Sequence, residues 1–335
     1  MVKKKIALII DSEGWAFDNI AHRLKENLTN FDIDIIPGRI FEGNMIKLFL
    51  FCEDYDLIHF MWRGYISLID RDEMHKYCDT LGITFEEFKE RFILSKKITF
   101  AVCDELYLEG NDSWRTEEIM QYAKSYFVTS NRLLQIYQKF SKKPAEVIHD
   151  GVDLKKYVAQ NTERFENKHG CIVAGWTGNS KFIDSDGDSD MKGVEGIIKP
   201  AIQELKEEGY NITLNLADRN IKMIKQEEMP NFYNSLDIYL CMSKNEGTPL
   251  PVLEAMAMGI PIISTDVGIV REAFGDKQKK YIISRDKESL KSAIKEMINN
   301  EGEFKNLSKE NLERIKEWDW PKIANKYEEF FNNNI

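Results

Sequence analysis

Apolar and polar residues along the first half of the chain follow two different periods in turn. A short apolar run at Lys5–Ile10 is followed by a polar turn at Asp11–Gly14, and from Ile20 the apolar residues recur at helical spacing. Short β-branched runs favour buried strands, whereas helical spacing favours amphipathic helices. Further strands are predicted at residues 33–36, 57–61, 98–102, 126–129 and 146–148, and helices at 85–94, 117–124 and 132–140. Strands that alternate with helices predict a parallel sheet covered on both faces.

The same pattern starts again after a polar stretch in the middle of the chain. The segment His149–Asp153 contains a glycine, and the residues that follow it are very polar as far as His169. Such a change of composition is typical of a domain boundary. Beyond it, strands are predicted at 171–175, 212–217, 238–241 and 261–264, and helices at 194–207, 231–236, 252–258 and, as two longer helices, 287–318. We therefore predict an α/β fold of two Rossmann-like, doubly wound domains that face a central cleft, with ligands at the carboxyl ends of the strands.

Composition restricts the class of protein. The 335 residues suit two domains, and a formal net charge of −10 excludes a broad basic surface for nucleic acid. Five cysteines without a CxxC pair support neither a disulfide framework nor a zinc site, which favours a reducing cytoplasm. The apolar run before Asp11 is too short for a signal peptide or a membrane span, so a cytoplasmic protein is expected.

The segment Glu246–Gly259 carries the sharpest chemical pattern in the chain. It follows the predicted strand 238–241 and enters a helix in which Pro251 suits the first turn. The backbone amides of Thr248 and Leu250 are then expected at a helix N-terminus, where free N–H groups and the helix dipole favour an anion. Glu246 precedes this anion site and Glu254 follows it. A phosphate flanked by two carboxylates that can hold sugar hydroxyls predicts a nucleotide-sugar ligand.

The string EGTPLPVLEAMAMGIPIISTDVG, with its Glu-x7-Glu spacing, resembles the signature of retaining GT-B glycosyltransferases of the family 4 group. Residues 128–131 and 147–153 are similar to the end of that family's first domain. Residues 175–180 and 191–193 are similar to the start of its second domain, and residues 318–324 to its terminal helix, which crosses back to the first domain. The resemblance implies a GT-B fold, with a first, acceptor-side domain at 1–155 completed by the helix 319–335, and a donor domain at 156–318.

The resemblance also implies an activity: a metal-independent, retaining hexosyltransferase. Such an enzyme moves a sugar from a nucleotide-sugar to the hydroxyl of a glycan or lipid-linked acceptor, here in surface polysaccharide synthesis and without a cofactor. Lys192 is expected to neutralise the diphosphate, Glu246 to lie at the donor sugar and Glu254 to bind the ribose. The remaining donor-side residues are predicted to be Gly14, Thr248, Pro249, Leu250, Gly178, Asn179, Lys181 and Arg219.

Two positions depart from the family pattern. Cys103 precedes Asp104 where family members carry a histidine at the sugar, and His59 is the nearest alternative histidine. Trp176 and Thr177 stand where a phosphate-binding arginine is expected, which leaves Lys181 or Arg219 as its replacement. The replacement of the histidine by Cys103 keeps one alternative open, a partner subunit of low activity that binds sugar nucleotides. A GT-B nucleotide-sugar epimerase is a second alternative, over which the hinge and the Glu-x7-Glu string favour transfer.

An acidic loop at Asp184–Asp190 offers carboxylates at the first, third and fifth positions of a calcium loop. Its sixth position is Ser189, where the turn of such a loop needs glycine, so calcium binding is not expected. The three lysines at 3–5 leave open a weak, peripheral contact with the inner membrane face.

Overall fold

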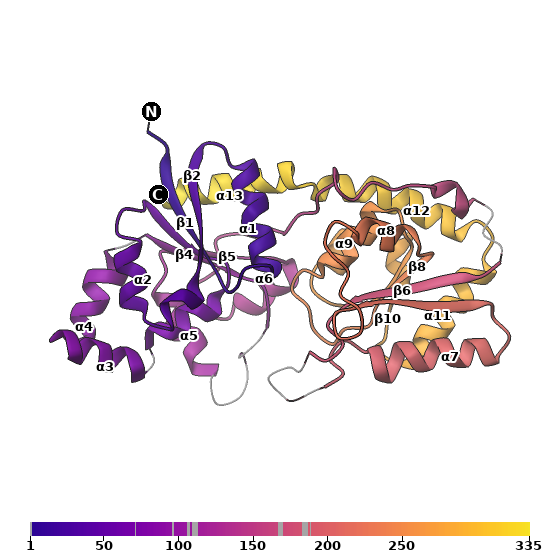
Figure 1. Cartoon of the computed structure of the whole chain (residues 1–335), viewed down its shortest axis with the longest axis horizontal. Coiled ribbons are helices and arrows are strands. Elements are labelled where there is room, and N and C mark those ends of the chain that lie inside the picture. The colour runs from indigo at the N-terminus through magenta and orange to yellow at the C-terminus, as the bar shows by residue number, and fades with distance from the viewer. Residues whose placement is uncertain are drawn as a thin grey trace. The chain divides into compact units, whose positions relative to one another are not determined.

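The computed structural model describes residues 2–70, 72–95, 97–105, 108, 113–166, 170–182, 187 and 189–335. The chain forms two compact units, one of residues 1–150 with 320–335 and one of residues 151–319. Each unit is built on a five-stranded sheet, and every strand pairing recorded in the two sheets is parallel (Figure 1).

The first unit carries its sheet in the order β2-β1-β3-β4-β5. Its strands are β1 (Lys4–Ile10), β2 (Phe31–Pro37), β3 (Leu57–Phe60), β4 (Ile98–Val102) and β5 (Ser125–Val128). Its helices are α1 (Ala16–Asn27), α2 (Met45–Phe51), α3 (Asp72–Leu81), α4 (Phe85–Phe88), α5 (Ser113–Gln121), α6 (Asn131–Tyr137) and α13 (Trp320–Asn334). The terminal helix α13 lies beside α1 (Figure 1), so the last residues of the chain complete the first unit.

Alternation along the strands divides the core of the first unit between two faces. In β3, Ile58 and Phe60 belong to a cluster with Phe49 of α2 and Phe88 of α4. His59 points the other way, toward the phenylalanines of α13. The two faces are therefore covered by different helices, as the sequence pattern predicts.

The second unit has the sheet order β10-β9-β8-β6-β7. Its strands are β6 (Ile172–Gly178), β7 (Ile212–Asp218), β8 (Ile238–Cys241), β9 (Ile262–Thr265) and β10 (Ile282–Ile283). Its helices are α7 (Lys199–Glu207), α8 (Met229–Asn234), α9 (Leu250–Ala257), α10 (Val270–Ala273), α11 (Lys287–Asn299) and α12 (Glu303–Arg314). Helices α7 and α11 pack together on one face (Figure 1), whereas α9 packs on the other.

Three local predictions need correction. The strand expected at 146–148 is a single bridge, Val147 to Val128, at the end of β5. The helix expected at 85–94 is the short α4 followed by a π-helical segment, Lys89–Leu94. The helix expected at 194–207 likewise begins as a π-helical segment, Val194–Ile198, before α7. In each case the residue pattern predicts a strand or a helix at the right place, but the backbone hydrogen bonds that form there differ from the regular ones.

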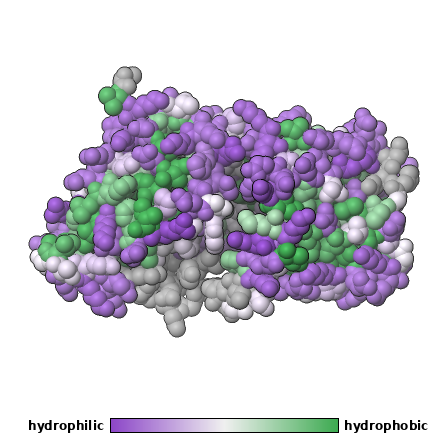
Figure 2. Space-filling view, viewed as in Figure 1, coloured by the Kyte–Doolittle hydropathy of each residue, from purple (hydrophilic) through white to green (hydrophobic). Residues whose placement is uncertain are grey.

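The surface of the first unit includes apolar side chains over α2. Ile40, Leu50 and Phe51 are all exposed, and Phe51 makes an edge contact with Phe41 at 5.6 Å between ring centroids. Figure 2 shows hydrophobic surface in this region. Within the described residues, no helix combines the length and the apolar character needed to cross a bilayer.

Candidate functional site

The order of the second sheet indicates where a ligand can bind. β6 lies between β7 and β8 in the sheet. The chain continues from β6 to β7 on one side, and then crosses to β8 on the other side of β6. Helix α7, after β6, and helix α9, after β8, pack on opposite faces. The loops that follow β6 and β8 therefore diverge at the carboxyl edge, which is where open α/β sheets bind ligands. Lys192 belongs to the first of these loops and Glu246 to the second.

Lys192 and Glu246 form an ion pair between these two loops. The Lys192 Nζ lies 2.6 Å from Glu246 Oε1, and the two side chains are 19% and 21% exposed. Ser243 Oγ donates a hydrogen bond of 2.7 Å to the same carboxylate oxygen. The Lys192 ammonium also lies 5.5 Å from the centroid of the Phe182 ring. The pair is thus held in place, partly shielded and still reachable from solvent, as an anion-binding site requires.

Backbone contacts hold the two loops together around this pair. The Lys244 amide donates to the Met191 carbonyl at 2.8 Å. Gly193, at φ +70°, approaches so closely that a Cβ there would lie 2.5 Å from the Met242 carbonyl oxygen. The Arg285 guanidinium donates to the carbonyls of Met242 at 3.0 Å and Asp190 at 2.6 Å. The close approach at Gly193 and the two hydrogen bonds of the partly buried Arg285 therefore fix the spacing of the two loops that carry Lys192 and Glu246.

The start of α9 differs in one detail from the sequence prediction. Pro249 precedes the helix, and the Leu250 amide donates to the Thr248 carbonyl at 2.8 Å. One of the two amides expected to receive the donor is therefore already bonded within the loop. The Thr248 hydroxyl is buried and has no hydrogen-bond partner among the described residues. Thr248 thus offers a polar atom at this helix start, in addition to its backbone.

Glu254 lies one turn into α9 and is held by aromatic hydroxyls. The Tyr233 hydroxyl of α8 donates to Glu254 Oε2 at 2.5 Å. Burial raises the pKa of Glu254, while the phenols of Tyr233 and Tyr157 and the charge of Lys156 act in the opposite direction. The carboxylate that was predicted to bind ribose is therefore partly desolvated and oriented before any ligand arrives.

The predicted residues at the end of β6 form a separate network. Asn220 Nδ2 donates to Asn179 Oδ1 at 2.7 Å and to Asp218 Oδ1 at 2.9 Å. The Arg219 amide donates to the Gly178 carbonyl at 3.0 Å. The side chains of Lys181 and Arg219 are exposed. The structure thus ties the ends of β6 and β7 together, and none of the contacts described for this network reaches Lys192 or Glu246.

In the first unit, Cys103 and Asp104 directly follow β4 and lie beside the residues that follow β3. Asp104 accepts hydrogen bonds from Trp62 Nε1 at 2.7 Å and from Arg63 Nη2 at 3.0 Å. The Cys103 thiol donates to the Met61 carbonyl at 3.7 Å, and burial raises its pKa well above the ordinary value. Cys103 is therefore a neutral thiol at physiological pH, and it supplies neither the charge nor the paired hydrogen bonds of a histidine.

Gly14 has a local structural reason to be glycine. Its backbone is in the left-handed region at φ +75°, and its amide donates to Asp18 Oδ2 at 2.7 Å. The amide is thus engaged in starting α1. A Cβ at Gly14 would meet no atom within 4 Å, so the space beside this turn is open.

His59 lies in the core rather than at a surface where a sugar can bind. Its side chain is fully buried and stacks on Phe127 at 5.5 Å, with Phe330 and Phe331 of α13 at its edges. Its Nδ1 lies 2.9 Å from Thr99 Oγ1. The alternation of β3 directs the ring toward α13, so His59 is a structural residue, and the expectation that it could stand at the donor sugar is wrong.

Burial lowers the pKa of His59 to about 3, and this shift predicts a dependence of stability on pH. The unfolded state takes up a proton below about pH 6.5 and the folded state does not, so stability falls as pH decreases from about 6.5 toward 3. We expect His59 to account for about 2 kcal/mol of the loss between pH 7 and pH 5. Denaturant unfolding of His59→Gln should show a correspondingly smaller loss, and exposed His75→Gln should match the unmodified protein. Equal losses in all three proteins would contradict the prediction.

Sequence reasoning missed several residues that the fold brings to this region. Ser243 stands two residues after β8 and three before Glu246, so loop spacing alone was a usable signal. Tyr233 and Arg285 carried no local signal, because they reach Glu254 and Met242 from 21 and 43 residues away. Contacts of this kind depend on how helices and loops are placed around the sheet.

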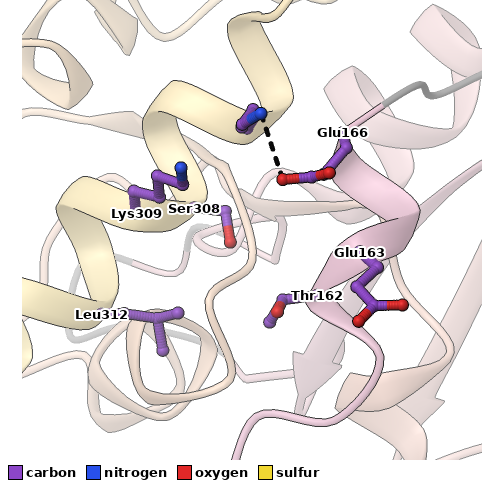
Figure 3. Close-up of a pocket in the computed structure, with 7 residues that line it drawn as sticks. Thr162, Glu163, Glu166, Ser308, Lys309 and Leu312 are labelled. Atoms are coloured by element: carbon purple, nitrogen blue, oxygen red, sulfur yellow. Dashed lines mark ion pairs between the residues drawn. The ribbon is translucent and has the colours of Figure 1, made fainter.

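A small cavity of about 80 Å³ lies elsewhere in the second unit, between residues 162–166 and α12 (Figure 3). Lys305 Nζ pairs there with Glu166 Oε1 at 3.1 Å. The lining residues include neither the loop after β6 nor the loop after β8. This cavity is therefore distinct from the site around Lys192.

Most of the acidic loop at Asp184–Asp190 lies outside the described residues, and the expectation that it binds no calcium stays a prediction. Asp190 itself is described: its two carboxylate oxygens accept from the amides of Glu195 at 3.0 Å and Gly196 at 2.9 Å. Asp190 thus serves the start of the helical segment that leads into α7.

Comparison with known proteins adds a family match over part of the chain and a fold over nearly all of it. Residues 203–314 match the sequence model of the family Glycosyl transferases group 1. The matched segment contains Glu246 and Glu254. The chain is 37% identical over 73 residues to the lipopolysaccharide core biosynthesis mannosyltransferase LpsB of Rhizobium meliloti, an alignment that spans 21% of this chain and 21% of that relative.

Solved structures match over nearly the whole chain. Sucrose-phosphate synthase from Thermosynechococcus elongatus aligns with a TM-score of 0.70 at 15% identity, covering 99% of each chain. Anabaena Alr3699/HepE in complex with UDP and glucose aligns with a TM-score of 0.68 at 12% identity, covering 98% of this chain and 100% of that one. These likenesses confirm the predicted fold class, GT-B with two Rossmann-like units.

Proposed function

We propose that this protein is a retaining glycosyltransferase that transfers a hexose from a nucleotide-sugar to a hydroxyl of a glycan or lipid-linked acceptor in surface polysaccharide synthesis. The observation that carries the proposal is the Lys192–Glu246 ion pair at the switch point of the second sheet. It places one positive and one negative group together, next to the start of α9. A diphosphate bearing a sugar needs this combination.

The comparisons support this assignment. The Glycosyl transferases group 1 match spans both glutamates, and the relative from Rhizobium meliloti is named as a mannosyltransferase of lipopolysaccharide core synthesis. The HepE structure, similar in fold, contains UDP and glucose. A nucleotide-sugar donor and a carbohydrate acceptor are the substrates that fit these likenesses.

In the proposed sugar transfer, the main task of the protein is to stabilise the negative charge that develops on the departing phosphate. The bond between the anomeric carbon and the phosphate oxygen breaks, and the acceptor oxygen bonds to the same face of that carbon. The acceptor proton passes to the departing phosphate, so no separate protein base is required. Lys192 exchanges its partner Glu246 for the phosphate and stabilises the charge that develops there. Glu246 is then free to accept hydrogen bonds from the sugar hydroxyls. The proposed reaction uses no metal.

The proposed acceptor side lies in the first unit. A lipid-linked acceptor would bring the enzyme to a membrane surface, and weak peripheral association there is part of the proposal. Supporting it, Lys47 is exposed on α2, the same short helix that exposes Leu50 and Phe51. Apolar side chains next to a basic residue suit the interface of an anionic bilayer.

The donor site is tested by thermal stabilisation with a panel of nucleotides and nucleotide-sugars of all five common bases, measured both with divalent cations and with EDTA. A ligand that binds only the native state raises the melting temperature. We expect one base to give a selective rise, and Glu254→Ala to lose it because the ribose loses its charged partner. Glu166→Gln, at the cavity of Figure 3, serves as the control and should keep the rise.

No stabilisation by any member of the panel would contradict donor binding by this chain. A rise that EDTA abolishes would contradict metal independence. A rise that Glu254→Ala retains in full would remove the ribose role from Glu254, while leaving donor binding itself in place.

A further inference from the structure

The Tyr233 hydroxyl holds the Glu254 carboxylate and has no role of its own in the proposed contacts with the donor. Tyr233 is fully buried in α8, and its hydroxyl donates to Glu254 Oε2 at 2.5 Å. Its ring packs against Tyr157 at 5.9 Å and Tyr239 at 6.0 Å. The packing therefore holds the phenol in one orientation, with its hydroxyl directed at the Glu254 carboxylate.

Three elements of the second unit meet at this carboxylate. Tyr233 comes from α8, Tyr239 from β8, and Lys156 and Tyr157 come from the segment that follows the break between the units. Lys156 Nζ lies 4.9 Å from the centroid of the Tyr157 ring and donates to Gln226 Oε1 at 2.8 Å. These are the titratable and charged groups that act on Glu254. Lys156 is the one cation among them.

We propose that Tyr233 is a positioning residue for the donor nucleotide: by donating to Glu254 it fixes the orientation and the charge of the carboxylate that receives the ribose hydroxyls. The inference rests on the proposed function. A buried carboxylate without a donor takes up a proton more readily and rotates more freely, and in either state it accepts hydrogen bonds from ribose less well. Burial raises the pKa of Tyr233 well above its ordinary value, so the phenol remains a donor throughout the neutral range.

Tyr233→Phe removes the hydroxyl and keeps the ring. Binding of UDP, GDP, ADP, CDP and TDP is measured by calorimetry between pH 5 and pH 8. The variant is expected to bind the preferred diphosphate roughly tenfold more weakly at pH 7. Because the pKa of Glu254 rises when the phenol is lost, the decline of affinity on acidification should begin at a higher pH than in the unmodified protein. A loss without this displacement of the pH profile would indicate a packing effect and overturn the proposal.

Tyr281→Phe is the matched control for this measurement. Tyr281 is also fully buried in the second unit, and its hydroxyl donates to Glu303 Oε1 at 3.0 Å. Both variants thus remove a buried Tyr–Glu hydrogen bond, but only Tyr233 serves Glu254. The control is expected to keep the unmodified affinity and pH profile. Equal changes in both variants would overturn the proposal.

A second measurement needs no ligand and separates this proposal from the donor assignment. A carboxyl whose pKa is raised by folding lowers stability as pH rises through that value. The melting-temperature deficit of Tyr233→Phe should therefore be larger at pH 7 than at pH 5. In Tyr233→Phe/Glu254→Gln, compared with Glu254→Gln alone, the deficit should be the same at both pH values. A pH-independent deficit in Tyr233→Phe itself would overturn the proposal even if nucleotides bind. The expected pattern without any nucleotide binding would instead contradict the donor assignment.

Discussion

Glu246→Gln is expected to abolish sugar transfer, lowering kcat by about a thousandfold, while the second unit remains folded. The amide keeps the size of the side chain, but it carries no charge to hold Lys192, now 2.6 Å away, or to interact with the donor sugar as positive charge develops on the anomeric carbon. Binding of the nucleoside diphosphate alone should stay equal or become tighter, since the Lys192 charge is no longer neutralised. Release of diphosphate from the nucleotide-sugar gives kcat, and calorimetry gives the affinity.

A loss of turnover with a preserved affinity for the nucleoside diphosphate would assign Glu246 to the transfer step rather than to donor binding. Glu166→Gln removes a carboxylate from a more exposed ion pair with Lys305 in the same unit and should change neither quantity. Full turnover in Glu246→Gln would remove Glu246 from the mechanism. A parallel loss of diphosphate affinity would assign Glu246 to the fold of the site instead.

Lys192→Met is expected to give the opposite result in the affinity measurement. Removing the ammonium leaves the Glu246 carboxylate, held by Ser243 at 2.7 Å, without its cation. An incoming diphosphate then meets an uncompensated negative charge, so its affinity should fall by roughly a hundredfold. Turnover should fall by about a hundred- to a thousandfold, because the leaving phosphate loses its stabilising charge.

Lys305→Met is the control for this variant, since it also removes a lysine from a partly exposed ion pair of the second unit. It should bind diphosphate normally. If Lys192→Met also binds normally, the cation that receives the diphosphate lies elsewhere, and Lys181 and Arg219 become the residues to test. The double variant Lys192→Met/Glu246→Gln should regain part of the affinity, because the repulsive carboxylate is gone.

The contrast between these variants depends on a contact that joins residues 54 positions apart. The sequence pattern predicts Glu246 and the family resemblance implies Lys192, but as members of two separate motifs. Their pairing follows from the sheet order, which makes β6 and β8 neighbours and brings the following loops to one edge. The close approach of Gly193 to the Met242 carbonyl then determines how near the two side chains come.

Local elements were the most accurately predicted part of the fold. The strands at 98–102 and 238–241 were predicted with the bounds that the structure has, because each is a continuous apolar run that a buried parallel strand requires. Helices α2 and α3 were not predicted. α2 exposes Leu50 and Phe51, and its sequence of nearly continuous apolar residues lacks the helical period. In the folded chain α2 contacts α4, where the ring centroids of Phe49 and Phe88 lie 6.3 Å apart.

The expectations for His59 and Cys103 also depend on contacts that a local sequence pattern does not contain. A histidine at the end of an apolar strand left two readings open, and only the face on which it lies decides between them. In the structure that face is covered by α13, more than 260 residues later in the chain, and His59 stacks among its phenylalanines. Cys103 lies beside Met61, where its thiol is buried and neutral.

The fold class could be predicted from the sequence, because the alternation of strand and helix periods and the composition change near residue 150 are local properties of the chain. The pattern around Glu246 and Glu254 and the family resemblance of Lys192 also predict the residues of a donor site, and this stays a prediction. The contacts among these residues appear only in the folded chain: Lys192 pairs with Glu246, the Leu250 amide donates to the Thr248 carbonyl, and the Tyr233 hydroxyl donates to Glu254. Those contacts join distant segments, and their geometry is set by strand order and by packing between helices, which no local pattern encodes.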